Sequence, residues 1–425
     1  MRPRISVVIP THNHSRVVPR TLNALGRQTL PSGEFEVLLV LDGCSDDTAR
    51  VVGALDVPYE LHPVEQPPSG AAAARNRGAA MAKAPILLFL DDDMEASPDL
   101  LAAHLEIHEA HPGGVVLGYF PLEVPEGDPD PYTLAIKSWW DRAFVALAHP
   151  AHRFTFLDFC TGNVSLPRAV FEAVGRFDES FPGASTEDYE IGARLLKRRV
   201  PMRFSREAAS LHCDAPTRER SLRRAAADGR GQVLLARRHP ELASLLKLGE
   251  PPGSTSSRLY WHLVWKSPTA ATLLAAVFRR LLGACVKLGW TGLMWRFYGG
   301  LDVHAYWSAV RGEVGALEDW RRLVDSASRS RTDVRELEVD LAEGFGRLES
   351  LLAATPVDGL KLRYRESVLG EIEPLPAAEP LRYAHVRFEL IQRFGSELLP
   401  LLLVDWLGSR SAGELAETIA AADTR

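Results

Sequence analysis

The sequence predicts an α/β fold built on a doubly wound, mostly parallel sheet. In the first hundred residues, short apolar runs alternate with segments of helical spacing. Each run is apolar at almost every position, as in strands that are buried on both faces, and strand–helix alternation makes their sheet parallel. The runs end at Pro10-Thr11, at Asp42-Gly43 and at Asp91-Asp92-Asp93. Because ligands of open α/β sheets bind beyond the carboxyl ends of the strands, these residues mark the expected site.

The individual elements follow from the spacing of apolar residues. Val18, Leu22 and Leu25 recur at the period of a helix, whereas 35–41 is a continuous apolar run typical of a buried strand. Residues 70–82 are rich in alanine, a strong helix former. The predicted strands cover residues 5–9, 35–41, 59–64 and 86–90, and the predicted helices cover 16–28, 46–55, 70–82 and 98–111. Farther along the chain, residues 115–124 and 202–211 are strand-like and 132–148 are helical in pattern.

The pattern changes along the rest of the chain, and three regions are predicted. Residues 1–215 are expected to form the catalytic domain and 216–329 a basic and aromatic helical region. Residues 330–425 are expected to form an α+β or helical domain of unknown role, with a helix over 334–352 and a strand over 360–364. The chain after the sheet domain is therefore predicted to be mainly helical.

Composition excludes several classes of protein. Of the 425 residues, 46% are apolar and 24% charged, as in ordinary globular proteins, and a net charge of −6 argues against a generic nucleic-acid binder. The four cysteines lie far apart, so we expect neither a zinc ribbon nor a disulfide framework, and a cytoplasmic location fits. Apolar runs near residues 269–286 are cut by Arg279-Arg280 and Lys287, so we expect no membrane-spanning helix. Peripheral contact at the inner face of the membrane stays open.

Asp91-Asp92-Asp93 is the strongest chemical signal. Carboxylates at the end of a buried strand need a compensating partner, and Mg²⁺ bound to phosphate oxygens is a natural one. In an extended segment Asp91 and Asp93 share one face, so these two are the candidate metal ligands. The alternative is an acidic turn that faces solvent.

Several motifs together resemble family-2 glycosyltransferases of the GT-A fold. The donor-side motifs are Ser6-Val-Val-Ile-Pro-Thr-His-Asn13, Val40-Leu-Asp-Gly-Cys-Ser-Asp-Asp47, Ala74-Arg-Asn-Arg-Gly78 and Phe89-Leu-Asp-Asp-Asp93. The acceptor-side motifs are Thr161-Gly-Asn-Val-Ser165, Gly175-Arg-Phe-Asp-Glu179 and Thr186-Glu-Asp-Tyr-Glu190. The resemblance covers about residues 3–215, and the order and spacing of the motifs make it specific.

The resemblance implies a nucleotide-sugar site. Asp42 and the backbone near Pro10 and Thr11 would hold the base, Asp91 would reach the ribose, and Asp93 would bind the metal. Arg75 would offset diphosphate charge. The full set of implied nucleotide-sugar ligands is Pro10, Thr11, Asn13, Asp42, Arg75, Asp91, Asp92, Gly162 and Asn163. The alternatives are an ordinary Asp-Gly turn at Asp42, an exposed helix face at Arg75 and a plain turn at Gly162-Asn163. Leu41, Cys44 and His12 depart from the commoner family pattern.

The second implied centre is Glu187-Asp188, with Asp188 as the base that takes the acceptor's proton. A helix N-terminus would favour the ionised carboxylate. The alternative is a helix-capping role, because Ser185 stands three residues before Asp188, as in a capping box, and Glu187 is a candidate for capping. His212 follows a strand-like segment and is a candidate further metal ligand; a loop histidine is the alternative.

Two further features are open to more than one interpretation. Residues 194–238 hold 13 Lys/Arg against four Asp/Glu, which indicates either a solvated helical face or contact with a lipid phosphate or anionic membrane. Trp139-Trp140 would either stack on an acceptor sugar or pack in a core. His12 and His14 are interpreted as structural or solvent-facing.

The sequence as a whole predicts a metal-dependent, inverting glycosyltransferase. The expected donor is a nucleoside-diphosphate sugar, with UDP as nucleotide, and the expected cofactor is Mg²⁺ or Mn²⁺. The acceptor would be a hydroxyl of a carbohydrate, a lipid-linked compound or a small molecule, receiving a hexosyl or hexosaminyl group. The alternatives are a nucleotidyltransferase, disfavoured because the first strand lacks a Gly-rich phosphate loop, and a non-catalytic sugar-nucleotide-binding or membrane-docking protein.

Overall fold

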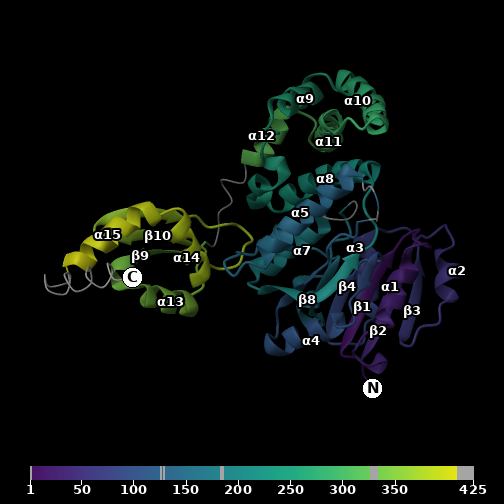
Figure 1. Ribbon diagram of the computed structural model, residues 1–425, viewed down its shortest axis with the longest axis horizontal. Coiled ribbons are helices and arrows are strands. Elements are labelled where there is room, and N and C mark those ends of the chain that lie inside the picture. Colours follow the sequence, from purple (N-terminus) through teal and green to yellow (C-terminus); the bar gives the residue numbers. More distant parts are fainter. Residues whose placement is uncertain (1, 125–126, 128–129, 182–185, 326–333, 409–425) are drawn as a thin grey trace. The chain divides into compact units, whose positions relative to one another are not determined.

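An eight-stranded sheet flanked by helices forms the first half of the molecule (Figure 1). The computed structural model describes residues 2–124, 127, 130–181, 186–325 and 334–408. The strand order is β3-β2-β1-β4-β7-β6-β8-β5. The strands are β1 (Ile5–Thr11), β2 (Phe35–Asp42), β3 (Glu60–Gln66), β4 (Ile86–Leu90), β5 (Met94–Ala96), β6 (Val115–Tyr119), β7 (Asn163–Pro167) and β8 (Met202–His212).

The parallel half of the sheet sets the position of the site. β1 lies between β2 and β4 and pairs in parallel with both, and β2 pairs in parallel with β3. Thr11 is level with Leu41, and Asp42 is level with Gln66, so polar strand ends gather at one edge. The apolar side chains of β1, β2 and β4 are almost all buried, which confirms the predicted mostly parallel α/β sheet.

The sequence analysis did not predict β5 and β7. β5 has only three residues, and β7 carries the buried polar residues Asn163 and Ser165, which disguise it as a turn. The core accepts them because His104 hydrogen-bonds both Asn163 Oδ1 (2.8 Å) and Ser165 Oγ (2.8 Å). Both strands are antiparallel to their neighbours, including β7 with β4 and β5 with β8.

Helices cover the sheet and place the motif-bearing loops. They are α1 (Val18–Leu25), α2 (Thr48–Gly53), α3 (Ala71–Met81), α4 (Leu100–Ala110), α5 (Pro131–Leu147), α6 (Arg168–Val174) and α7 (Thr186–Lys197). Gly78 lets α3 approach the sheet, because a Cβ at this position would lie 2.5 Å from Val8 Cγ1. This close contact holds Arg75, one turn earlier on α3, beside the carboxyl ends of the strands.

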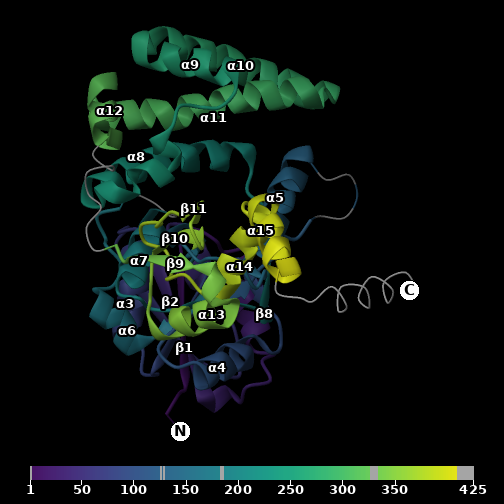
Figure 2. The ribbon, with the colours of Figure 1, turned by 90° about the vertical axis from the view of Figure 1, so that its left-hand side faces the viewer.

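A helical layer follows the sheet, as predicted. It consists of α8 (Arg218–Arg238), α9 (Thr255–Lys266), α10 (Pro268–Leu288), α11 (Thr291–Val314) and α12 (Leu317–Asp325). Figure 2 shows α9, α10 and α11 stacked beyond α8, on the side away from the sheet. One described helix, α10, is long and apolar enough to cross a membrane by length and composition. The sequence criterion, an uninterrupted apolar run, excluded it because of its three basic residues.

The chain divides into two compact units, residues 1–148 with 154–331 and residues 149–153 with 332–425. Residues 216–329 thus lie in the same unit as the sheet. The second unit has a three-stranded sheet in the order β11-β10-β9. Its elements are β9 (Glu336–Asp340), α13 (Phe345–Ala354), β10 (Gly359–Tyr364), β11 (Ser367–Ile372), α14 (Tyr383–Gln392) and α15 (Gly395–Gly408).

The helix predicted over 334–352 is wrong in its first half. β9 pairs in parallel with β10, with Leu337 level with Leu360, and only the later part forms α13. Gly344 adopts a φ of 99°, which a helix does not accommodate, and it separates the two elements. The predicted strand over 360–364 is confirmed as β10.

Candidate functional site

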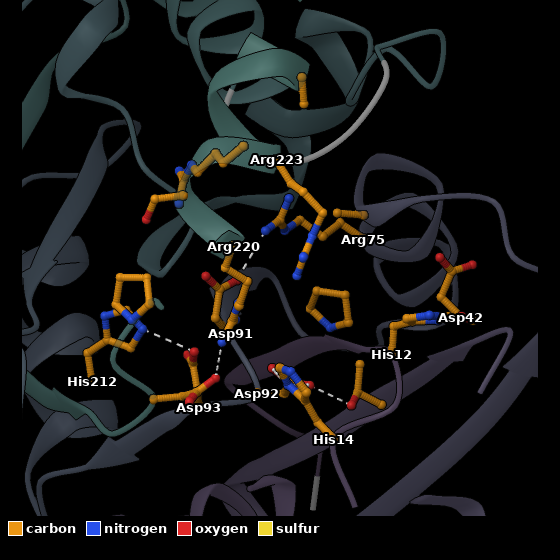
Figure 3. Close-up of a pocket in the computed structure, with 18 of the residues that line it drawn as sticks. His12, His14, Asp42, Arg75, Asp91, Asp92, Asp93, His212, Arg220 and Arg223 are labelled. Carbon is orange, nitrogen blue, oxygen red and sulfur yellow. Dashed lines mark hydrogen bonds and ion pairs between the residues drawn. The ribbon is translucent and has the colours of Figure 1, made fainter. Parts of the chain in front are cut away.

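A pocket of about 520 Å³ lies at the carboxyl ends of the parallel strands. This volume falls within the range of small-molecule sites. Its floor comes from the strand ends and its opposite wall from α8 (Figure 3). Of the predicted ligands, Pro10, Thr11, Asp42, Arg75, Asp91, Asp92, Asp93 and His212 line it. A pocket thus lies at the sheet edge where the carboxyl-end rule predicts a site.

The three consecutive aspartates have three different environments. Asp91 accepts a hydrogen bond from Arg75 Nη2 at 3.1 Å. Asp92 is buried and accepts from Thr11 Oγ1 at 2.5 Å, with His14 Nδ1 at 2.9 Å, and burial raises the pKa of its carboxyl. Asp93 Oδ2 lies 3.0 Å from His212 Nε2. The carboxylate of Asp92 is therefore occupied by contacts within the protein, and Asp91 and Asp93 are the members of the triplet that could contact a ligand.

Asp93 and His212 suit a divalent cation. Asp93 is buried, and its second oxygen, Oδ1, has no hydrogen-bond partner among the described residues. An orphaned buried carboxylate oxygen is costly unless a ligand completes it. Carboxylate oxygen with imidazole nitrogen is a donor set compatible with Mn²⁺, and the carboxylates suit Mg²⁺. The residues present therefore fit the predicted metal.

A second group of potential metal ligands, Glu36, Glu60 and His62, lies elsewhere in the described chain. Glu36 is the second residue of β2 and Glu60 the first of β3, so both lie at the opposite end of the strands from the pocket. Lys83 Nζ lies 2.8 Å from Glu60 and 3.6 Å from Glu36 and already supplies a positive charge there. This group does not belong to the pocket.

Asp42 and Asn13 organise the loops around the base end of the pocket. Asp42 accepts from Gln66 Nε2 (2.9 Å) and from the backbone N–H groups of Ser69 (2.7 Å) and Gly70 (2.8 Å), so it fixes the segment between β3 and α3. Asn13 accepts from the N–H of Ser45 at 2.7 Å and adopts a φ of 55°. Asn13 is not among the pocket-lining residues, which makes it a loop-positioning residue rather than a ligand.

Arg75 joins the pocket to the predicted catalytic pair. Its guanidinium is buried, donates to Glu187 Oε1 at 2.9 Å and lies 4.0 Å from Asp188 Oδ1. Burial works to lower the pKa of Arg75, but Asp91, Asp188 and Glu187 raise it further, so the arginine stays charged. Glu187 thus pairs with a cation in the core.

Asp188 is buried at the start of α7. Its Oδ2 accepts from the Thr161 N–H (3.2 Å) and hydroxyl (3.1 Å), while Oδ1 has no hydrogen-bond partner among the described residues. Burial, and then the neighbouring Glu187 charge, raise the pKa of Asp188 well above that of an ordinary carboxyl, whereas Arg75 lowers it. A raised pKa is typical of a general base. The capping alternative depended on Ser185, which lies outside the described residues.

Asn163 is not where the family resemblance implied. It is fully buried, and its amide group donates to Ala208 O at 3.0 Å and pairs with His104. Neither Asn163 nor Gly162 lines the pocket; Gly162 O instead accepts from the N–H of Asp91 at 3.2 Å. Asn163 is a core residue of β7, and Gly162 supports the aspartate turn.

The sequence analysis missed the opposite wall of the pocket. Arg220 and Arg223 of α8 face the aspartates from the other side (Figure 3). The lining also includes Arg224 of α8, His12, His14 and Trp140. The arginines belong to the basic segment 194–238, whose charge was noted without a location. Their spacing at positions i, i+3 and i+4 was the available signal, since it puts them on one helix face. Trp139, by contrast, is exposed outside the pocket.

Comparisons with known proteins agree with this geometry. Residues 6–175 match the model of the family described as Glycosyl transferase family 2. Over 229 residues the chain is 38% identical to validoxylamine A glucosyltransferase of Streptomyces hygroscopicus subsp. jinggangensis, covering 48% of this chain and 54% of that protein. The chain therefore spans about half the length of these curated relatives.

Solved structures also resemble the chain. The mannosyltransferase PcManGT from Pyrobaculum calidifontis, in complex with GDP-Man and Mn²⁺, is 19% identical with a TM-score of 0.47, over 73% of this chain and 87% of that one. S. aureus TarS 1–349, in complex with UDP, is 17% identical with a TM-score of 0.42, over 73% and 90%. The family match covers the strands and motifs that line the pocket, so residues 6–175 are similar to a family 2 glycosyltransferase domain.

Proposed function

We propose that this protein is a metal-dependent, inverting glycosyltransferase that moves a sugar from a nucleoside-diphosphate sugar, with UDP as nucleotide, to a hydroxyl. One observation carries the proposal. A single pocket combines Asp91 and Asp93 at the strand ends with arginines of α8, and Arg75 connects this pocket to the buried Asp188. Acidic groups for a metal, basic groups for phosphates and a nearby carboxylate base are the parts that such a transfer requires.

The donor's parts match different walls of the pocket. The base and ribose would lie near Thr11, Asp42 and Asp91, whose oxygens accept hydrogen bonds from N–H and hydroxyl groups. The diphosphate would lie between the aspartate turn and α8, where Arg220, Arg223 and Arg224 offset its charge. This arrangement orients the sugar toward Arg75 and Asp188.

Asp93, with Asp91 and His212, would hold Mg²⁺ or Mn²⁺. When bound, such an ion neutralises negative charge on phosphate oxygens as the leaving group departs. The residues on the opposite wall serve the same end, since the α8 arginines also stabilise the departing diphosphate. Asp92 stays bound to Thr11 and His14 and keeps the aspartate turn in place.

The transfer step uses Asp188 as the base. Asp188 Oδ1 takes the proton of the acceptor hydroxyl while that oxygen forms a bond to the anomeric carbon. The bond from this carbon to the diphosphate oxygen breaks, and the nucleoside diphosphate leaves with the electron pair. Displacement from the opposite face inverts the anomeric configuration. The orphaned Oδ1 is the acceptor available for this hydrogen bond.

The acceptor is proposed to be a hydroxyl of a carbohydrate, a lipid-linked compound or a small molecule, and the transferred group a hexose or hexosamine. The relative named validoxylamine A glucosyltransferase supports transfer of a glucosyl group, which is a hexosyl group. Trp140 lines the pocket and offers a ring for sugar stacking. The proposed location is the cytoplasm, because the four cysteines lie far apart in the sequence, and peripheral contact at the inner face of the membrane stays open.

Two measurements test the proposal. Thermal unfolding of the full chain against a panel of nucleotide sugars, with and without Mn²⁺, should show stabilisation by one donor that grows with metal. NMR of the product should show the anomeric configuration opposite to that of the donor. A retained configuration would exclude Asp188 as base in a direct displacement. Donor binding without transfer to any hydroxyl or to water would instead favour a non-catalytic binding protein.

A further inference from the structure

α10 carries an apolar face that no described element covers. Leu273, Val277, Leu281 and Leu288 are exposed by 67%, 47%, 41% and 58%. They recur at intervals of four and seven residues, so they share one side of the helix. The side that packs on α11 is separate and includes Ala275, Leu282 and Cys285, which cluster with Met294 and Leu301 of α11. α10 therefore has one face in the protein core and a second apolar face toward solvent.

The charge around this face has one sign. From residue 251 to residue 301 the chain contains no aspartate or glutamate, while Arg258, Lys266, Arg279, Arg280, Lys287 and Arg296 contribute six positive charges. Arg280 and Lys287 border the apolar stripe on the helix, and both are exposed. Trp290, at the turn after α10, is 55% exposed. Apolar residues bordered by cations and an interfacial tryptophan are the pattern of helices that lie on anionic membranes.

We propose that the exposed face of α10 docks this protein on an anionic lipid bilayer. The helix would lie in the plane of the surface, with the leucine stripe in the acyl boundary. Arg280 and Lys287 would reach the lipid phosphates, since long basic side chains extend toward head groups. Charge complementarity is what selects an anionic bilayer over a neutral protein partner.

An in-plane orientation explains the position of the charges better than a spanning one. Arg279 and Arg280 stand near the middle of α10, where a spanning helix would place them at the bilayer centre, at high cost. The opposite face of α10 is already committed to α11, which packs along α8. Because α8 also forms a wall of the pocket, docking would hold the transfer site close to the membrane surface (Figure 2).

Vesicle flotation of the full chain tests the proposal. Wild type should float with phosphatidylglycerol–phosphatidylcholine vesicles, and binding should fall at high salt and on pure phosphatidylcholine. Val277→Gln/Leu281→Gln should lose flotation at least tenfold, and Arg280→Gln/Lys287→Gln should lose the preference for the anionic lipid. The control is Val145→Gln on α5, an exposed apolar residue of the same unit, and this variant should bind as wild type does.

Three outcomes would overturn the proposal. One is wild type that does not float, or flotation that Val277→Gln/Leu281→Gln leaves unchanged. Another is a dimer in solution that the same double variant dissociates, since a second copy would then cover the face. The third is retention of the full chain in membranes washed with alkaline carbonate, which indicates a spanning helix. Donor-induced thermal stabilisation should be the same in all variants, so failure of the docking proposal is distinguishable from failure of the proposed transfer.

Discussion

The two walls of the pocket differ in how well the sequence predicts them. The strand-end wall, with Asp42 and Asp91 to Asp93, is encoded locally, because each acidic group directly follows an apolar run. The α8 wall, with Arg220, Arg223 and Arg224, lies more than a hundred residues later in a segment that reads only as a basic helix. The end of a strand can be placed in an α/β sheet from the sequence, because ligand sites lie at the carboxyl ends of the strands. The position of a helix face is known only once the helix has packed against the rest of the protein.

The largest expected effect is on Asp188, the proposed general base, which does not itself line either wall of the pocket. Asp188→Asn keeps the shape of the side chain but cannot take a proton, so the turnover rate should fall by about 10² to 10⁴. Donor affinity, measured by calorimetry, should stay near that of wild type. Asp141→Asn, an exposed change on α5, serves as the control. Wild-type turnover in Asp188→Asn would remove it from the mechanism.

The strand-end wall is tested by the metal. In Asp93→Asn the metal concentration needed for half-maximal activity should rise by ~100-fold or more. Loss of a residue that only orients a metal ligand already lowers metal affinity by ~10–100-fold, and loss of the ligand itself should lower it further. Chelation should abolish transfer by wild type, and Mn²⁺ or Mg²⁺ should restore it. Equal activity of Asp93→Asn at all metal concentrations would place the ion elsewhere.

The α8 wall is tested by the diphosphate. In Arg223→Gln/Arg224→Gln the affinity for nucleoside diphosphate should fall about tenfold or more, since a hydrogen bond to a charged group contributes ~1.5–3 kcal/mol. Affinity for the free nucleoside should not change. Arg230→Gln, on the same helix but outside the pocket, is the matched control. If the nucleoside alone were weakened as much, the arginines would contact the base instead.

The electrostatic coupling between Glu187 and Asp188 is tested by the pH dependence of the turnover rate. Because the pKa of Asp188 is raised, the turnover rate should increase with pH as its carboxyl ionises. Glu187→Gln removes a neighbouring negative charge that contributes to this raised pKa, so the midpoint should move to lower pH. Glu172→Gln on α6 should leave the profile unchanged. A midpoint that moves upward in Glu187→Gln would contradict this coupling.

The smallest effect on activity is expected at Asn163. Asn163→Ala should lower the free energy of unfolding by ~1–3 kcal/mol, because Ala208 O and His104 lose a buried partner. Donor affinity of the folded variant should be unaffected. Chemical denaturation and calorimetry measure the two quantities separately. A large loss of donor affinity in Asn163→Ala would indicate that Asn163 takes part in donor binding.

Much of the fold and half of the site followed from local patterns. β1, β2 and β4, α3 with Arg75 and the aspartate turn were all predicted, because continuous apolar runs and helical spacing indicate burial directly. β7 was missed because Asn163 and Ser165 are polar residues whose partners, His104 and His108, come from a distant helix. β9 was mistaken for a helix because its pairing with β10 outweighs local spacing.

By itself, the sequence determined the sheet, the edge where ligands bind and the charge of each segment, since these depend on residues close together in the chain. Only the tertiary structure decided which charges face one another. It placed the arginines of α8 across from Asp91 and Asp93, buried Arg75 between Glu187 and Asp188, and left one face of α10 uncovered. These are contacts between distant segments, and packing of helices on a sheet, rather than local propensity, brings such segments together.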